Sequence, residues 1–582
     1  MSDSTPSTWW MFHGDPAHTG EATGSNIDST SVKNLALLHS IEVKGSILST
    51  PAVDDQFVYV GLANSLEAVK QDGGQFLKIE LATGNVVQKF TWAIDPVDRD
   101  THGFCGMGCT PAVINGKVFF SAFDGKLYCL DQNDFSKPLW VTDLRYADMA
   151  HNQPVTNDFP NGIGQAKASG WSSPLVVGDR VYLGMGEGEN AYLYGFIYCI
   201  DANSGDVIWM FCTCQYDINK NNEPNQLPLE TIRQELPAGF TTVTMQPVAK
   251  GASVWSGIAY DPGTNQLFAA TGNPQPDGTL PTAGYTNSIV ALDATSGAFK
   301  GYVQIPGTSP EGSALPSGSY RPNSDIDVDI GGAPTIYQLN GKTVVGIGCK
   351  NGVYMVFDPT NLSTAIPPPN VPIVSRQMLP YMNDGSQIPT VDPHYVDGPS
   401  NPQPVVPNNV SNAVPGENFQ GTYSTAALCS LQQKLFIGIG GNNYHYISSG
   451  IDTPNVPFIR AMDWTTLEDA WPLDDGDPKR YKCAQDPNNP LYKNAGESGI
   501  SVPAVVNDVV FMSTTLVALY AFSATDGTLL WSDAENFGPQ TGGMSGGYGY
   551  CMGPAIAGNY VVAGALVQGG TGGVLNIYTL PK

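Results

Sequence analysis

The chain has 582 residues with 65 glycines and 45 prolines, and only 14% of its residues are charged. Long surface helices need more Lys, Glu and Arg, so this composition favours many short strands joined by tight turns. The net charge of −26 repels phosphate backbones and argues against a nucleic-acid partner. No apolar run reaches the length of about 18 residues that a membrane-spanning helix requires.

The amino terminus, MSDSTPSTWW, lacks the charged start and apolar run of a secretory signal peptide. Either the protein stays inside the cell or a leader has been removed. None of the ten cysteines belongs to a CxxCH haem-attachment motif or to a CxxC pair. Two pairs lie in loops and are disulfide candidates, Cys105 with Cys109 and Cys212 with Cys214. The cysteines expected to be buried within apolar strands are Cys129, Cys199 and Cys349.

One pattern recurs along the chain: an apolar strand, an Asp, a turn containing Gly, and an apolar or aromatic residue about nine positions after the strand's end. The clearest copy is IYCIDANSGDVIW at 197–209. Turns such as Asn-Ser-Gly supply the positive-φ residues of a tight chain reversal. The seven copies, two of them degenerate, span 76–90, 127–140, 197–209, 289–302, 353–366, 459–471 and 519–531.

A second element follows, in which small residues and a Pro lead into an apolar strand. It occurs at 49–53, 109–113, 172–176, 332–336, 501–505 and 553–556. Repeats of roughly 50–90 residues that are built from a few strands indicate a propeller or an array. Each unit is too small to bury its own faces and must therefore stack on its neighbours.

The two ends of the chain predict how the ring closes. The last strand, at 574–580, has no partner after it, and the strand at 35–43 has no complete repeat before it. Pairing them would remove the exposed sheet edges. We therefore expect an all-β protein, an eight-bladed β-propeller whose N- and C-terminal strands close the last blade, with seven blades as the alternative. Residues 1–582 then form one domain, with long loop insertions near 213–250, 360–420 and 472–497.

Four segments carry polar residues that a structural repeat does not need. They lie in different repeats, and a propeller brings equivalent strand ends together at its axis. Alternation on an extended chain would project the three aspartates of SDIDVDIGGAP toward one side. Together with Glu and Asn they would form an oxygen-rich site of the kind that calcium prefers. Taken singly, each segment also fits an ordinary turn or a solvated acidic edge. The residues are Glu189, Asn273, Asp325, Asp327, Asp329 and Lys350.

The sequence resembles the PQQ-dependent alcohol dehydrogenases, quinoproteins with an eight-bladed propeller, along nearly its whole length from WWMFHGDPAHTG at 9–20. The stretch SPLVVGDRVYLGMGEGE places Glu189 at the family's metal-binding Glu. The stretch VWSGIAYDPGTNQLFAATGNP places Asn273 at the metal-binding Asn and Trp255 at the tryptophan beneath the quinone plane. The run IDVDIGGAP places Asp327 at the catalytic Asp, which also binds the metal, and Lys350 matches the basic residue beside the quinone carbonyls.

The resemblance also implies the remaining cofactor-binding residues. Many relatives carry two adjacent cysteines over the quinone, whereas here FCGMGCTPAV separates Cys105 from Cys109 by three residues. These two could still form a disulfide over the cofactor, although the ring made by adjacent cysteines is impossible. The Arg that follows this segment in relatives is absent. Other cofactor-binding residues implied by the resemblance are Ser172, Ser173 and Gly188.

Asp329 lies two residues after Asp327, an offset that accompanies a lanthanide in some relatives and calcium or magnesium in others. We expect Ca²⁺, with a lanthanide as the alternative, and Asp329 as a further metal ligand. Another departure is Ile326, where many relatives have an aromatic residue. The departures together are most similar to the polyvinyl-alcohol-dehydrogenase-like branch.

The implied reaction is oxidation of an alcohol, small or polymeric, with hydride transfer to PQQ. Asp327 would act as general base and Lys350 would stabilise negative charge on the quinone oxygen. Electrons would pass to an external acceptor such as a cytochrome c, because no haem motif is encoded. Family members are periplasmic or secreted. The alternatives are a non-catalytic propeller scaffold, which has no reason to retain these four polar segments, and a propeller hydrolase or lyase acting on a polysaccharide.

Overall fold

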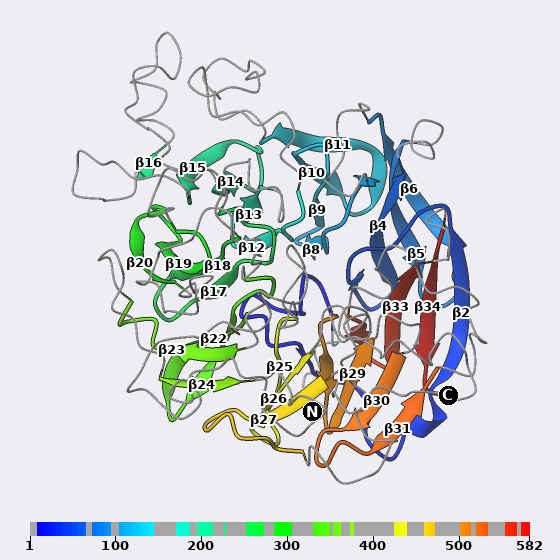
Figure 1. The fold of residues 1–582 in the computed structure, drawn as a ribbon. Coiled ribbons are helices and arrows are strands. Elements are labelled where there is room, and N and C mark those ends of the chain that lie inside the picture. The colour runs from blue at the N-terminus through cyan, green and yellow to red at the C-terminus, as the bar shows by residue number, and fades with distance from the viewer. Residues whose placement is uncertain are drawn as a thin grey trace, which may run out of the picture.

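The computed structural model describes most of the repeating framework of the chain. Its described residues are 8–65, 73–94, 104–144, 170–186, 195–213, 226–228, 252–272, 285–304, 330–349, 353–362, 373–377, 424–438, 459–471, 501–513, 519–533, 553–566 and 572–581. Within them no helix is long and apolar enough to cross a membrane. They form eight antiparallel sheets arranged as the blades of a ring, which confirms the predicted eight-bladed propeller (Figure 1).

The blades are numbered in chain order. Blade 1 contains β3 (Ala52–Val53), β4 (Phe57–Ser65), β5 (Gly74–Glu80) and β6 (Val86–Trp92), and β7 (Phe104–Gly106) also pairs with β4. Blade 2 contains β8 (Ala112–Ile114), β9 (Lys117–Ser121), β10 (Lys126–Asp131) and β11 (Asp134–Asp143). Blade 3 contains β12 (Leu175–Val177), β13 (Arg180–Met185), β14 (Phe196–Asp201), β15 (Val207–Cys212) and β16 (Gln226–Pro228). Blade 4 contains β17 (Ala259–Asp261), β18 (Gln266–Ala270), β19 (Ser288–Asp293) and β20 (Phe299–Gln304).

The second half of the ring repeats this order. Blade 5 contains β21 (Thr335–Leu339), β22 (Lys342–Gly348), β23 (Val353–Phe357) and β24 (Val374–Gln377). Blade 6 contains β25 (Ala427–Cys429), β26 (Lys434–Gly438) and β27 (Ile459–Asp463). Blade 7 contains β28 (Ala504–Val506), β29 (Val509–Ser513), β30 (Leu519–Ser523) and β31 (Leu529–Ser532), with β1 (Glu21–Ala22) beside β28. Blade 8 contains β32 (Ala555–Ala557), β33 (Tyr560–Leu566), β34 (Gly573–Thr579) and β2 (Ala36–Val43). A short 3₁₀ helix, η1 (Val32–Asn34), precedes β2.

Two of the regions predicted to be long loops contribute strands. β16 adds a fifth strand to blade 3, and β24 forms the fourth strand of blade 5. The repeat copy at 353–366 therefore holds only the third strand of its blade. The fourth strand begins at Val374, later than the turn spacing of the other copies predicts.

The ring closes as the two ends of the sequence predict. β2 pairs antiparallel with β34, from Ala36 opposite Thr579 to Val43 opposite Gly573. Blade 8 is thus built from both ends of the chain, and a contact on each side holds it in the ring. The indole N–H of Trp531 in blade 7 donates to the Leu35 carbonyl at 3.0 Å. On the other side, the Nε2 atom of His39 lies 3.0 Å from the Ala82 carbonyl oxygen of blade 1.

The repeated Asp and Gly shape the turn between the third and fourth strands. In blade 3 the Asp201 carboxylate accepts hydrogen bonds from the backbone N–H groups of Asn203 and Ser204, and Gly205 adopts a positive φ of 78°. The Trp140 side chain of blade 2 packs on Gly205, where a Cβ atom would lie 2.7 Å from the indole. Its N–H donates to the Ala202 carbonyl at 3.3 Å. The repeated residues therefore join each blade to the next.

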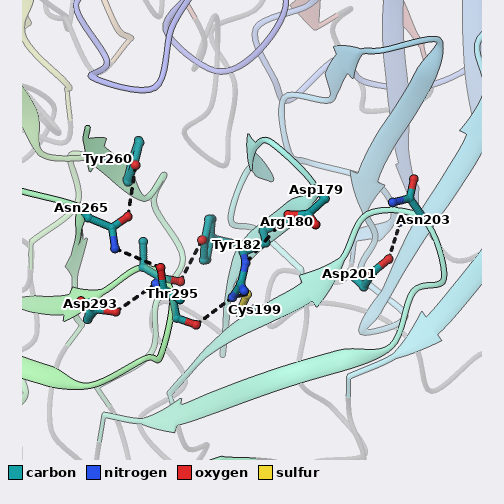
Figure 2. Close-up of polar contacts among 11 residues, drawn as sticks. Asp179, Arg180, Tyr182, Cys199, Asp201, Asn203, Tyr260, Asn265, Asp293 and Thr295 are labelled. Atoms are coloured by element: carbon teal, nitrogen blue, oxygen red, sulfur yellow. Dashed lines mark hydrogen bonds and ion pairs between the residues drawn. The ribbon is translucent and has the colours of Figure 1, made fainter. Parts of the chain in front are cut away.

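Blades 3 and 4 are joined at the corresponding turn by different side chains (Figure 2). The Arg180 guanidinium donates to the Thr295 carbonyl at 2.7 Å, and the Tyr182 hydroxyl donates to the Ala294 carbonyl at 2.9 Å. Both acceptors belong to the turn that follows Asp293. The contact between blades 2 and 3 and the contact between blades 3 and 4 therefore lie at equivalent turns. The hydrogen-bond donor is an indole in the first contact and a guanidinium and a phenol in the second.

The first described segment of the chain runs across one end of the hub (Figure 1). It pairs with the first strands of six blades, each time two residues after the Pro of the repeated small-residue/Pro element or after the equivalent position. Trp9 pairs with Val53, and five backbone N–H groups of the blades donate to carbonyls of the segment at 2.7–2.9 Å. These donors, with their acceptors, are Val113 to Trp10, Tyr260 to Pro16, Ile336 to Ala17, Leu428 to Thr19 and Val505 to Gly20. The segment 9–20 therefore covers the end of the hub where the first strands turn into the second.

The interfaces between blades are apolar. Between blades 1 and 2, for example, Phe76 stacks on Phe120 with ring centroids 4.6 Å apart, and Phe120 stacks on Tyr128 at 5.1 Å. The three cysteines predicted to be small buried residues of strands are each 0% exposed, which confirms their role in this packing. They are Cys129, Cys199 and Cys349.

Candidate functional site

All of the predicted metal ligands and catalytic residues lie outside the described residues: Glu189, Asn273, Asp327, Asp329 and Lys350. The predicted cofactor-binding residue Gly188 also lies outside them, as do Asp325 and Ile326. The residues on either side of them are described, however, and they show where each segment leaves the framework.

These segments leave the framework at one rim. In an antiparallel blade the first-to-second and third-to-fourth turns lie at one end, so the second-to-third connections and the links to the next blade lie at the other. Met185, Ala270 and Gly348 are the last residues of the second strands β13, β18 and β22. The link that contains Asp327 enters blade 5 at the same rim through Ile330, which is fully buried.

Blades 3 and 4 meet closely at this rim. The Val254 N–H donates to the Met185 carbonyl at 3.3 Å, and a Cβ atom at Gly186 would lie 2.6 Å from that of Ser253. A Cβ at Gly184 would lie 2.3 Å from a methyl group of Val254. Gly184 and Gly186 therefore have to be glycine for the 252–255 segment to lie against the end of β13. Gly186 is three residues before Glu189 in the sequence.

The contacts continue from blade 4 to blade 5. The Gly272 N–H donates to the Ser253 carbonyl at 2.8 Å, and the Ile330 N–H lies 3.5 Å from the Thr271 carbonyl oxygen. Gly272 immediately precedes Asn273, and Ile330 immediately follows Asp329. The described neighbours of three predicted metal-binding segments are therefore in one row of backbone contacts. Ile330 and Cys349, the neighbour of Lys350, also belong to one buried apolar cluster.

Trp255 stands in this row and is half-buried between the buried Val254 and Ser256. Ala252, three residues before it, adopts a φ of +52°, a left-handed conformation that residues other than Gly rarely take. The Ser256 hydroxyl is buried and makes no hydrogen bond within the described structure. A half-buried indole beside an unpaired hydroxyl suits a flat ligand with polar substituents.

Ser172 and Ser173 are buried and tie three blades together. The Ser172 hydroxyl donates to the Ser256 carbonyl of blade 4 at 2.8 Å and accepts the Gly184 N–H at 3.2 Å. The Ser173 hydroxyl accepts the Thr110 N–H of blade 2 at 3.0 Å. These bonds give both serines a role in the framework, and their contact with a cofactor stays a prediction.

The disulfide expected between Cys105 and Cys109 is not present, and both residues carry thiols. Cys105 is held in β7 opposite Asn64 of β4. The Cys109 thiol is directed instead to the Ser121 carbonyl, to which it donates at 3.3 Å, and burial raises its pKa to about 11. The other candidate disulfide, between Cys212 and Cys214, lies outside the described residues. Cys214 is not described, and only the backbone of Cys212 is described.

Sequence reasoning missed Trp171, which occupies the position in blade 3 that Trp255 occupies in blade 4. Each tryptophan is followed by a Ser, as the strings GWSSP and VWSGI show, and this repeated Trp-Ser pair is the signal in the sequence. Trp171 is half-buried, and its ring lies 4.7 Å from that of Phe123 at 52°.

The described residues do not contain a metal centre by themselves: no group of three or more His, Cys, Asp or Glu side chains gathers among them. Buried hydroxyls at the hub do fit a polar ligand, because several make no hydrogen bond within the described structure. Besides Ser256, these are the hydroxyls of Ser49 and Thr50, at the equivalent position of blade 1. Buried polar groups are nearly always paired, so unpaired ones indicate a missing partner.

Comparison with known proteins gives the same family as the resemblance. Residues 158–305 match the PQQ family model, described as a glucose/ethanol/alcohol dehydrogenase β-propeller domain. The quinohemoprotein alcohol dehydrogenase ADH IIB of Pseudomonas putida is 22% identical over 552 residues, which cover 90% of this chain and 69% of that protein. The dehydrogenase subunit of a quinone alcohol dehydrogenase from Komagataeibacter europaeus is 25% identical over 322 residues, covering 52% of this chain and 39% of that protein.

Solved structures share the fold. A quinohemoprotein alcohol dehydrogenase from Comamonas testosteroni superposes with a TM-score of 0.65 at 18% identity, covering 100% of this chain and 82% of that one. A europium-containing methanol dehydrogenase gives a TM-score of 0.63 at 15% identity, covering 99% and 98%. The family match in blades 3 and 4, where the row of contacts lies, and the relatives along the chain lead to one conclusion: this protein is similar in sequence to the PQQ-dependent alcohol dehydrogenases and shares their propeller fold.

Proposed function

We propose that this protein oxidises an alcohol, using PQQ and a metal ion held at the rim of the hub. The observation that carries the proposal is the row of backbone contacts from Met185 through Ser253 and Gly272 to Ile330. It joins the described neighbours of Glu189, Asn273 and Asp329. Those segments come from three blades, and a scaffold protein would not need polar residues in all of them.

Each residue has a role in this proposal. Trp255 offers its indole face to the cofactor, and Ser256 offers its unpaired hydroxyl. Glu189, Asn273 and Asp327 would supply oxygen ligands to the metal. PQQ, when bound, supplies the quinone that accepts a hydride from the substrate carbon.

The proton and the charge are handled by two side chains. The Asp327 carboxylate takes the proton of the substrate hydroxyl as general base. The Lys350 ammonium group would stabilise negative charge that develops on the quinone oxygen. Asp329 adds a second carboxylate to the site. We propose Ca²⁺ as the metal, with a lanthanide as the alternative because an additional carboxylate suits a trivalent ion.

Substrate and electron acceptor would approach from the rim. The opposite end of the hub is covered by residues 9–20, which bond to first strands of six blades. We propose a small or polymeric alcohol as substrate and an external acceptor such as a cytochrome c. We also propose a periplasmic or secreted location, on the basis of the same similarity.

The test is reconstitution of the purified protein with PQQ and calcium chloride. We expect the melting temperature to rise, since a ligand that binds the folded state stabilises it, and dye-linked alcohol oxidation to appear. Asp327→Asn should abolish oxidation, while the matched variant Asp329→Asn should retain it at a reduced level. Absence of both the thermal shift and the oxidation, with calcium and with lanthanum chloride, would overturn the proposal in favour of a scaffold.

A further inference from the structure

Two tryptophans occupy equivalent positions in neighbouring blades at the rim of the hub. Trp171 precedes Ser172 in blade 3, and Trp255 precedes Ser256 in blade 4. The two serines are joined by the hydrogen bond from the Ser172 hydroxyl to the Ser256 carbonyl at 2.8 Å. The two indoles are therefore carried by adjacent, directly bonded segments, and both are half-buried.

The fold holds the Trp171 ring over blade 2. A Cβ atom at Gly108 would lie 3.0 Å from Cζ3 of Trp171 and 2.6 Å from Cζ of Phe123. Both rings pack in one cluster with Leu48, which occupies the equivalent position of blade 1. Gly108 thus leaves the space in which the indole lies, directly beside the segment of Cys105 and Cys109.

The backbone of this tryptophan adjoins a predicted metal-binding segment. Gly170, its neighbour, forms a parallel bridge with Gly186 at the end of blade 3's second strand. Gly186 lies two residues before Gly188 and three before Glu189. The same Gly186 contacts Ser253, two residues before Trp255. Both tryptophans are therefore next to one strand end.

The chemistry of Trp171 suits a ligand that carries carboxylates. Its indole N–H makes no hydrogen bond to any described residue. Between Cys109 and Lys117 the chain has no cationic residue, and the Lys117 ammonium is bonded to the Ala202 carbonyl at 3.0 Å. PQQ is a planar tricarboxylate, so both an aromatic surface and an N–H donor at this place would bind it.

We propose that Trp171 is a second aromatic wall of the cofactor site, contacting bound PQQ from the blade next to that of Trp255. This inference rests on the proposed function. It adds a binding residue beside the segment 110–116, which contains no Lys or Arg. The indole would contribute apolar contact and a hydrogen bond to a ligand oxygen.

The test is equilibrium dialysis of the full chain with PQQ in calcium chloride. Loss of a stacked aromatic contact costs about 1 kcal/mol, so Trp171→Ala should raise the dissociation constant of PQQ about fivefold or more. Trp171→Phe, which keeps a ring and loses the N–H, should fall between wild type and Trp171→Ala. Gly108→Ala should raise the dissociation constant too, because the new Cβ displaces the indole.

Matched controls separate a binding role from a structural one. Trp140→Ala removes an indole at a blade contact, and Gly263→Ala adds a Cβ that meets only the Asp261 carboxylate at 3.3 Å. Both should leave the dissociation constant of PQQ unchanged. Wild-type affinity in folded Trp171→Ala would overturn the inference, and if that variant does not fold, wild-type affinity in Gly108→Ala would do so. Failure of the wild-type chain to bind PQQ would instead overturn the proposed function.

Discussion

The Ser172 hydroxyl donates to the Ser256 carbonyl at 2.8 Å while accepting the Gly184 N–H, so one buried side chain joins the hub ends of blades 3 and 4. Removing it leaves a carbonyl and an N–H unpaired in the interior. Each buried polar group that loses its partner costs about 1–3 kcal/mol.

The first prediction follows from this contact. Ser172→Ala should lower the free energy of unfolding by about 2–4 kcal/mol, because two buried partners lose their bonds. Urea unfolding of the apoprotein measures it. Ser173→Ala is the control, since its hydroxyl accepts one described N–H, and it should cost about half as much. Equal stability of the Ser172 variant and wild type would show that the blade contact is not needed.

The second prediction compares two buried tryptophans at the same position of the repeat. The Trp471 N–H donates to the Ala524 carbonyl at 3.1 Å, whereas the Trp209 N–H is buried without a partner within the described structure. Substitution by Phe removes similar volume at both sites. Trp471→Phe should therefore be less stable than Trp209→Phe by about 1 kcal/mol in urea unfolding. The reverse order would mean that packing on the neighbouring turn, not the hydrogen bond, decides stability.

The repeat and the closing of the ring could be predicted because they rest on local signals. Apolar strands followed by a short polar turn recur along the chain, with both the Asp and the turn Gly present at Asp201 and Gly205. The two terminal strands have no other partner and therefore pair with each other. The path of residues 9–20 could not be predicted in the same way. Its hydrogen bonds join backbone groups to strands that are hundreds of residues away, such as the bond from the Val505 N–H to the Gly20 carbonyl. Because every residue except Pro has a backbone N–H, such bonds cannot be recognised from residue types.

The site residues stay predictions. Trp255 was found through the resemblance, and the structure places it, half-buried, in the row of hub contacts. Trp171 was missed because a single half-buried aromatic breaks no periodic pattern. The candidate disulfide between Cys105 and Cys109 is not formed, and the sequence left this open because a spacing of four residues does not determine where each thiol points. Pairing of β7 with β4 fixes Cys105, and a carbonyl bond directs Cys109 elsewhere.

The third prediction concerns these two thiols. Both are buried, and burial raises the pKa of Cys109 to about 11, so little thiolate forms near neutral pH. Neither residue should react with iodoacetamide in the native protein at pH 7.5 (about one unit below an ordinary thiol pKa). After denaturation without reductant both should be alkylated, as peptide mass measurement would show. A peptide in which the two remain linked would contradict the structure.

The fourth prediction concerns Asp533, whose carboxylate accepts the Leu519 N–H at 2.7 Å and the Tyr578 hydroxyl at 2.6 Å. Burial raises its pKa from 3.8 to about 6. Between these values the folded protein holds the proton that the unfolded chain has lost, so this group makes the protein less stable as pH rises, by about 3 kcal/mol in total. Above pH 6 (about the folded pKa) its contribution is constant. Asp533→Asn cannot titrate, and urea unfolding at several pH values should show wild-type stability falling relative to the variant across this window. A difference that stays constant, or that changes in the opposite direction, would mean that the carboxylate is ionised in the fold at low pH.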